Sequence, residues 1–270
     1  MRHIKTYQIF EASASAPAAL TKGQIKWLNS CTAGSWKLNT STGLIDVDGD
    51  FDCSSKSLTD LKGIKFGEVS GVFSCYNNRL TSLVGAPQSV GINFYCNNNR
   101  LTSLEGAPQS VVRDFSCSNN QLTSLEGAPQ SVVRDFSCSN NQLTSLEGAP
   151  QTVGSYFYCE NNRLTSLVGA PQSVDGMFSC SNNQLTSLEG APQTVRIFYC
   201  NDNPVSEETL ASIFALMKKG KSYQQALEEH WPKMNSDDRA LMYKQMPNLP
   251  PEDERKYNAL AKYNNMKGYL

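Results

Sequence analysis

Apolar residues recur through the middle of the chain with a period of about 21 residues, because the pattern of phenylalanine followed two positions later by cysteine keeps returning. These phenylalanines are Phe51, Phe73, Phe94, Phe115, Phe136, Phe157, Phe178 and Phe198. Two apolar residues two positions apart point to the same face of a β-strand. Each repeat is therefore expected to supply one short strand, and neighbouring repeats are expected to stack these strands into a parallel sheet.

The full repeat reads Phe-x-Cys-x-x-Asn-x-Leu-x-x-Leu, as in residues 115–125. Its length and its spaced leucines resemble the leucine-rich repeat, with cysteine in one apolar position. The resemblance implies about eight coils that share one parallel sheet. The predicted fold class is α+β: a leucine-rich-repeat solenoid with a mainly extended convex side and helical caps.

A column of asparagines is expected to follow the strands. Its members are Asn78, Asn99, Asn120, Asn141, Asn162, Asn183 and Asn203. Only the first repeat departs, with Lys56. Buried amides in such a column can satisfy backbone groups that otherwise lack hydrogen-bond partners.

The return side of each repeat has the sequence Gly-Ala-Pro-Gln-Ser/Thr-Val, as in residues 85–90. Proline lacks an N–H donor and disfavours helix at the residue before it, so this convex side is expected to be extended. The valine stands four residues before the phenylalanine in most repeats, whereas Val195 stands three before Phe198. The extra residue predicts a small bulge.

The chain before the repeat array divides into two segments. Residues 1–20 contain a run of small residues and are expected to be a flexible N-terminal peptide and linker. Residues 21–50 are expected to cap the first coil. In that segment Thr21 and Gln24 fit a capping box before a short helix, and two short strands follow around a Thr-Ser-Thr-Gly turn.

The composition changes again after the array, which spans residues 51–203. Helix-start signals occur at Ser206, Ser222, Ser236 and Pro251. A repeat array must cover its terminal apolar face. Residues 204–270 are therefore expected to form a C-terminal helical cap.

Nine cysteines in a small secreted protein would suggest disulfides, but eight of these nine occupy the same position in successive repeats. Their position favours buried thiols that pack as small apolar side chains. The paired Cys-x-x-Cys spacing of a zinc site is missing, so no metal site is expected.

Four aspartates alternate with other residues between Asp46 and Asp52. The run resembles a calcium loop superficially, but Phe51 stands where that loop needs glycine, and the twelfth position lacks glutamate. Alternation is also the period of a strand. An acidic solvent face at the exposed end of the sheet is the simpler interpretation, because charge there discourages edge-to-edge association.

Charge and motif content point away from several function classes. The formal net charge is −1 and the pI is near 6.2, so nothing indicates nucleic-acid binding. No apolar run approaches the roughly 20 residues that cross a bilayer, so no membrane association is expected. The chain has two histidines and lacks a phosphate loop, a zincin motif and a nucleophile elbow. We expect no catalytic residues and no cofactor, and therefore a protein that is not an enzyme.

The outward residues of the predicted strands are mainly serine, asparagine and tyrosine, a mixture favoured in adaptable binding surfaces. Most of them repeat by duplication, so they also fit a merely soluble strand surface. The exceptions are the candidates for partner binding: Tyr76, Tyr95, Tyr158, Tyr199, Asn97 and Glu160. These residues predict a module that binds a protein through the concave sheet face. A structural virion protein without a host target and a glycan-binding protein are the alternatives.

Three segments resemble leucine-rich-repeat proteins of tailed bacteriophages. They are residues 46–53, the recurring Ser-Asn-Asn-Gln-Leu-Thr-Ser-Leu-Glu-Gly-Ala-Pro, and residues 203–210. The resemblance covers about residues 44–230. It implies a protein partner from the bacterial host and a location in the host cytoplasm, but it defines no activity.

The N-terminal residues 5–11 resemble the capsid-targeting peptides of internal head proteins in large contractile-tailed phages. In that family, a protease cleaves after a glutamate that follows Ile or Leu by two positions, and Ile9 and Glu11 meet this pattern. The resemblance implies packaging in the phage head and proteolytic processing at Glu11. Docking of this peptide on the first coil is the alternative.

Overall fold

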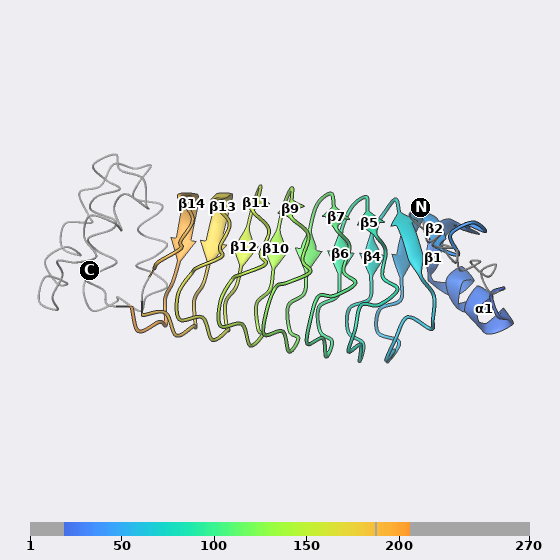
Figure 1. The fold of residues 1–270 in the computed structure, drawn as a ribbon, viewed down its shortest axis with the longest axis horizontal. Coiled ribbons are helices and arrows are strands. Elements are labelled where there is room, and N and C mark those ends of the chain that lie inside the picture. The colour runs from blue at the N-terminus through green and yellow to red at the C-terminus, as the bar shows by residue number, and fades with distance from the viewer. Residues whose placement is uncertain (1–18, 187, 206–270) are drawn as a thin grey trace, which may run out of the picture.

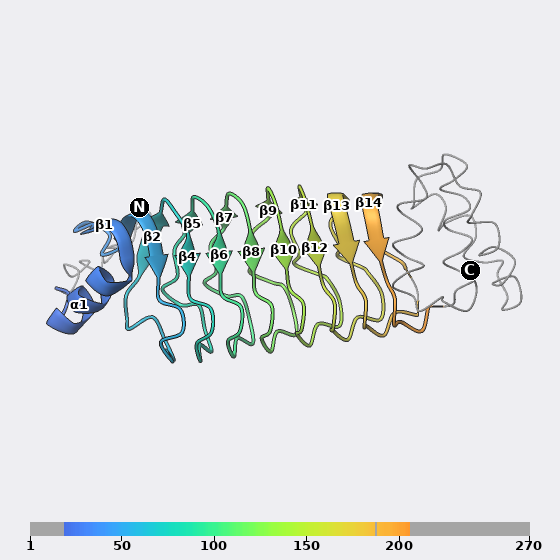
Figure 2. The same cartoon turned by 180° about the vertical axis from the view of Figure 1, so that it is seen from behind.

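The computed structural model describes residues 19–186 and 188–205, which form a solenoid built on parallel β-strands (Figure 1). The predicted solenoid and its parallel sheet are confirmed. The eight phenylalanines of the repeat bound seven complete turns, which stand side by side along a nearly straight axis in both views (Figure 2). Glu11, the N-terminal peptide up to residue 18 and the predicted helices after residue 205 lie outside the described residues.

The first described elements are a helix and a hairpin. Helix α1, Lys22–Cys31, begins with the predicted capping box, because Thr21 accepts from the backbone of Gln24 and the Gln24 side chain accepts from the backbone of Thr21. Strand β1, Thr32–Leu38, pairs antiparallel with β2, Ile45–Asp52. The ring of Trp27 meets Phe51 edge-on, with ring centroids 5.3 Å apart. The helix therefore covers the apolar side of the first turn.

Two parallel ladders run along the array. The first contains β3 (Phe66–Val69), β5 (Ser89–Val90), β7 (Ser110–Val111), β9 (Ser131–Val132) and β11 (Thr152–Val153). The second contains β4 (Phe73–Ser74), β6 (Phe94–Tyr95), β8 (Phe115–Ser116), β10 (Phe136–Ser137) and β12 (Phe157–Tyr158). Both ladders pair with β2 at one end and with β13 (Ser173–Ser179) at the other, and β14 (Thr194–Tyr199) pairs with β13.

This arrangement corrects the position predicted for the valines. The sequence placed them on the convex return side, whereas the structure places each one in the sheet, in a strand just before the phenylalanine strand or, in β13 and β14, in the same strand. Valine and phenylalanine are four residues apart, and both side chains face the core. The predicted bulge is confirmed in β13, because the register with β14 shifts between Val174 and Met177.

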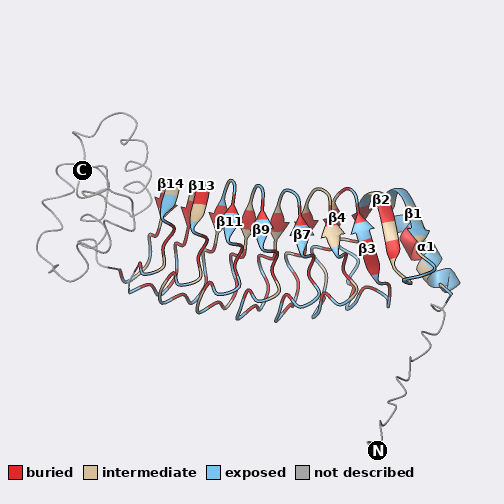
Figure 3. Ribbon diagram, turned by 45° about the horizontal axis from the view of Figure 1, so that its top comes forward, coloured by how far each residue is buried: buried red, intermediate tan, exposed pale blue. Residues whose placement is uncertain are grey.

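Buried residues recur in every turn of the array (Figure 3), and the core is a stack of identical side chains. Successive phenylalanine rings lie nearly parallel, with centroid separations from 5.1 Å for Phe157 and Phe178 to 5.6 Å for Phe73 and Phe94. The leucines of the repeat fill the other side of the core and are also fully buried. Each turn thus buries apolar surface mainly against its two neighbours, as expected of a solenoid.

All nine cysteines are free and buried, which confirms that they pack as small side chains. The thiol of Cys117 donates to the backbone oxygen of Ser137 in the next repeat over 3.4 Å, and four further cysteines repeat this contact. Burial raises the pKa of Cys75 and of Cys200 to about 12. These thiols therefore stay protonated and unreactive near neutral pH.

The aspartates of β2 bind the backbone and side chains of the next turn. Asp46 accepts from the N–H of Glu68 over 3.1 Å, and Asp50 accepts from the N–H of Val72 over 2.7 Å. The prediction that they lie at the exposed end of the sheet is wrong, because β2 lies between β1 and β3. No group of three metal-ligating side chains occurs among the described residues. The described helix is also too short and too polar to cross a membrane.

Candidate functional site

The outward surface of the phenylalanine strands carries three rows of side chains, which we call the sheet face. Successive side chains of a strand alternate between its two faces, so the residues just before and just after each inward phenylalanine point outward. The row before phenylalanine is Val72, Asn93, Asp114, Asp135, Tyr156, Met177 and Ile197. The row after it is Ser74, Tyr95, Ser116, Ser137, Tyr158, Ser179 and Tyr199. The row after cysteine is Tyr76, Asn97, Ser118, Ser139, Glu160, Ser181 and Asn201.

The structure separates the predicted partner-binding residues into two groups. Tyr76, Tyr95 and Asn97 lie on neighbouring repeats near the first turns, and Tyr76 is 40% exposed. The other group is Tyr158, Glu160 and Tyr199. Two repeats with serines in both of these rows separate the groups. The sheet face thus has two tyrosine-containing ends and a flat serine centre.

The second group lines a shallow groove of about 660 Å³. Tyr158 stands on one side and Tyr199 on the other, with Met177 between them in the first row. Serines and asparagines form the remainder of the lining: Ser118, Ser137, Ser139, Asn140, Asn161, Ser179, Ser181, Asn182 and Asn201. The groove therefore combines aromatic walls with a polar floor of small side chains.

Glu160 is the charged residue of this groove. Its carboxylate oxygen Oε2 accepts a hydrogen bond from the hydroxyl of Ser139 over 2.5 Å. Partial burial raises the pKa of Tyr158, and the negative charges of Asp135 and Glu160 raise it further. The phenol is therefore neutral and can donate a hydrogen bond at physiological pH.

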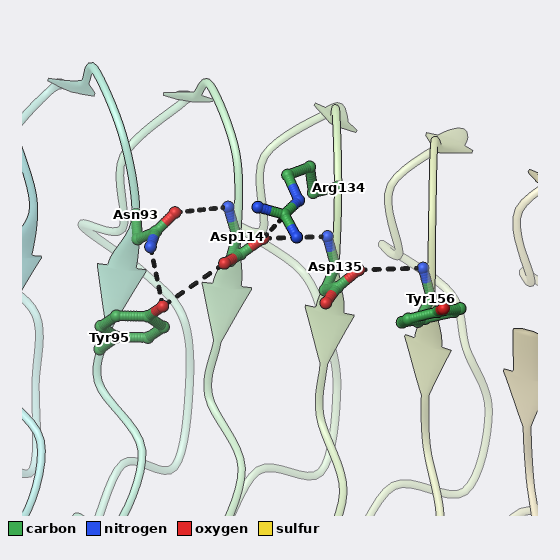
Figure 4. A network of polar contacts seen from close by, with 6 residues as sticks. All are labelled: Asn93, Tyr95, Asp114, Arg134, Asp135 and Tyr156. Carbon is green, nitrogen blue, oxygen red and sulfur yellow. Dashed lines mark hydrogen bonds and ion pairs between the residues drawn. The ribbon is translucent and has the colours of Figure 1, made fainter. Parts of the chain in front are cut away.

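A second polar cluster lies nearer the middle of the sheet face (Figure 4). The hydroxyl of Tyr95 accepts from the Asn93 amide over 2.8 Å and donates to Asp114 over 3.4 Å. Burial raises the pKa of Tyr95, and the Asp114 carboxylate raises it further. Arg134, which is largely exposed, approaches Asp114 to 3.8 Å. The hydroxyl of Tyr95 is thus held by two neighbouring side chains, and the residue is half-buried.

Side chains of the first row also bond to the bend between the two ladders in three neighbouring turns. The N–H groups of Asp114, Asp135 and Tyr156 each donate to the side chain of the residue one repeat earlier, over 3.1, 3.4 and 3.2 Å. Figure 4 shows these bonds as a chain across the repeats. Asp114 and Asp135 therefore have a structural task, because they satisfy backbone donors at the bend. The tyrosines are therefore better candidates for contact with a partner than these aspartates.

Sequence reasoning missed the whole first row. The available signal was the strand alternation itself, since the residues on both sides of an inward phenylalanine must point outward. Met177, which lines the groove, and Tyr156, whose ring centroid lies 6.0 Å from that of Tyr158, belong to this row. The aromatic group near the groove is therefore larger than the sequence predicted.

The described sheet face offers hydrogen bonds, aromatic surface and a few carboxylates. A nucleophile is not available among the thiols beneath it, because they are buried and protonated. The arrangement suits reversible binding. Comparison of the chain with protein-family models, with curated proteins and with solved structures finds no match.

Proposed function

We propose that this protein is a non-enzymatic binding module of the leucine-rich-repeat type, which engages a protein partner through the sheet face. The observation that carries this proposal is the groove between Tyr158 and Tyr199. The solenoid does not require tyrosine at either position, because serine occupies the same row in neighbouring turns at Ser137 and Ser179. A tyrosine that the fold does not need, such as Tyr158, can serve contacts with a partner.

The composition of the sheet face supports a protein as the partner. Tyrosine supplies rigid amphipathic contact area at a low entropy cost, and serine and asparagine supply adaptable hydrogen bonds. The two tyrosine-containing groups lie at different turns of the array, so an extended partner surface can contact both. The resemblance to phage repeat proteins adds the proposal that this partner belongs to the bacterial host and is met in the host cytoplasm.

Affinity capture with matched variants tests the proposal. The first variant replaces Tyr76, Tyr95, Tyr158 and Tyr199 with serine, the residue that other repeats carry in the same rows. The control replaces the exposed return-side residues Val84 and Val168 with glutamate, which other repeats carry there. We expect a protein from bacterial lysate that the wild type and the control retain and that the tyrosine variant loses. Equal retention by both variants would remove the sheet face from the proposal.

A further inference from the structure

The groove contains a slot of defined width. Tyr158, Ser179 and Tyr199 are register partners on β12, β13 and β14, so they stand side by side on one face. Neighbouring strands are about 4.8 Å apart, so the backbones of the two tyrosines lie roughly 10 Å apart. The small side chain of Ser179 stands between them. A planar group in van der Waals contact with both rings needs a separation of about 7 to 8 Å between the two ring planes. The slot is therefore wide enough for a guanidinium group or an aliphatic amine.

The floor of the slot holds an unused polar group. Ser179 is only 4% exposed, and its hydroxyl makes no hydrogen bond within the described residues. Its neighbours on both sides in this row are tyrosines, and its side chain points outward because Phe178 points inward. Its oxygen still reaches the solvent in the groove, because the fully buried side-chain atoms without a partner among the described residues are Nε1 of Trp27 and Oγ1 of Thr32. A ligand donor that enters the slot would satisfy it.

The charge of the groove has one sign. Among the described residues that line it, Glu160 is the only charged side chain. Ser139 occupies Oε2 of this carboxylate, and Oε1 accepts no hydrogen bond within the described residues. Asp114 and Asp135 are the other charged members of the sheet-face rows, and both are also acidic. The groove thus offers a carboxylate oxygen near the Tyr158 phenol, and none of the described residues that line it is basic.

We propose that this groove binds an arginine or lysine side chain of the partner, an inference that rests on the proposed protein-binding function of the sheet face. The cation lies between the rings of Tyr158 and Tyr199, where the negative ring faces attract it. It donates a charge-assisted hydrogen bond to Oε1 of Glu160 and a second bond to the Ser179 hydroxyl. Arginine fits best, because its planar guanidinium can stack on a ring while its fork of donors reaches two acceptors.

A titration of the full chain with small probes tests the charge and the site together. The probes are N-acetyl-arginine amide, its neutral analogue N-acetyl-citrulline amide, N-acetyl-lysine amide and the neutral disaccharide chitobiose, each followed by backbone amide chemical shifts. We expect arginine to bind about tenfold more tightly than citrulline, with shifts centred on residues 158–160 and 179. Equal binding of arginine and citrulline, or no response to arginine, would overturn the proposal. A response to chitobiose alone would assign the groove to a glycan.

Matched variants locate the effect. Glu160→Gln keeps the shape of the side chain and should abolish the preference for arginine over citrulline. Tyr158→Ser, which installs the residue of the neighbouring repeats, should weaken the binding of arginine. Tyr95→Ser changes the equivalent position three repeats earlier and should leave the titration unchanged. An arginine preference that survives Glu160→Gln would contradict the inference.

The same variants distinguish this inference from the proposed function. If the captured partner is lost on replacement of all four tyrosines but is unaffected by Glu160→Gln, the sheet face still binds protein and the cation site is wrong. If all four tyrosines can be replaced without loss of the partner, the proposed function itself fails.

Discussion

The side chain of Asn120 is bonded to the backbone of Leu101 in the preceding repeat, because its Oδ1 accepts from the Leu101 N–H over 3.0 Å. Its amide nitrogen donates to the carbonyl oxygens of Cys96 and Cys117 over 3.1 and 2.9 Å. One buried amide thus satisfies backbone groups in two repeats. Its predecessor Asn119 adopts a left-handed conformation with φ of 55°, which turns the chain into this position.

Asn120→Ala should therefore reduce the free energy of unfolding by about 2 to 5 kcal/mol, because three buried backbone groups lose their partner. Gln121→Ala, at an exposed neighbouring position, is the control and should cost less than about 0.5 kcal/mol. Equilibrium urea unfolding measures both. A loss for Asn120→Ala no larger than that of the control would refute the structural role of the asparagine column.

Cys117→Ser should destabilise the protein by about 1 to 3 kcal/mol, because a more polar hydroxyl replaces a thiol in a fully buried position. A reducing agent should leave the melting temperature of the wild type unchanged, since all nine cysteines are free. Thermal unfolding with and without reductant measures this. A sharp drop of the melting temperature on reduction would mean that the cysteines form disulfides.

Alkaline pH should weaken the fold. An unfolded thiol has a pKa near 8.5, whereas burial raises the pKa of Cys75 and Cys200 to about 12. Between these values the unfolded chain releases protons that the folded chain retains, so stability falls by about 1.4 kcal/mol per thiol for each pH unit. Urea unfolding at pH 7, 9 and 10 should show a steepening loss. An unchanged unfolding midpoint across this range would contradict the burial of the cysteine column.

Trp27→Ala should cost about 3 to 5 kcal/mol and favour association, because it uncovers the ring of Phe51 at the first turn. Ile25→Ala is the matched control on the same helix, since that side chain is 38% exposed. Urea unfolding and light scattering distinguish the two variants. If Trp27→Ala behaves like the control, the helix does not stabilise the end of the array.

The solenoid could be predicted from the sequence because each turn repeats the same apolar spacing, so every inward position appears several times. The asparagine and cysteine columns could be predicted for the same reason. The position of the valines could not be predicted from the sequence. The proline and glycine that precede them are equally compatible with a separate return segment and with a bent strand. In three turns the side chains of Asn93, Asp114 and Asp135 satisfy N–H groups at the bend one repeat away, a contact between repeats that the local sequence does not reveal.

The candidate site was predicted in part. Tyr158, Glu160 and Tyr199 were identified because they break the repetition, and the structure brings them to one groove. Met177 was missed with the rest of the first row, although strand alternation places it outward; its place between Tyr158 and Tyr199 depends on the register of β13 with β12 and β14. Such a register is a tertiary property, which a single repeat does not reveal.

Site-specific photo-crosslinking tests most directly whether the sheet face is the binding surface. In one variant a photoreactive phenylalanine analogue replaces Ser137, the register partner of Tyr158 on the sheet face. In a second variant the analogue replaces Glu147, which is exposed on the return side of the same repeat. The account predicts that the captured partner crosslinks from position 137 and not from position 147. A crosslink from position 147 without one from position 137 would contradict it.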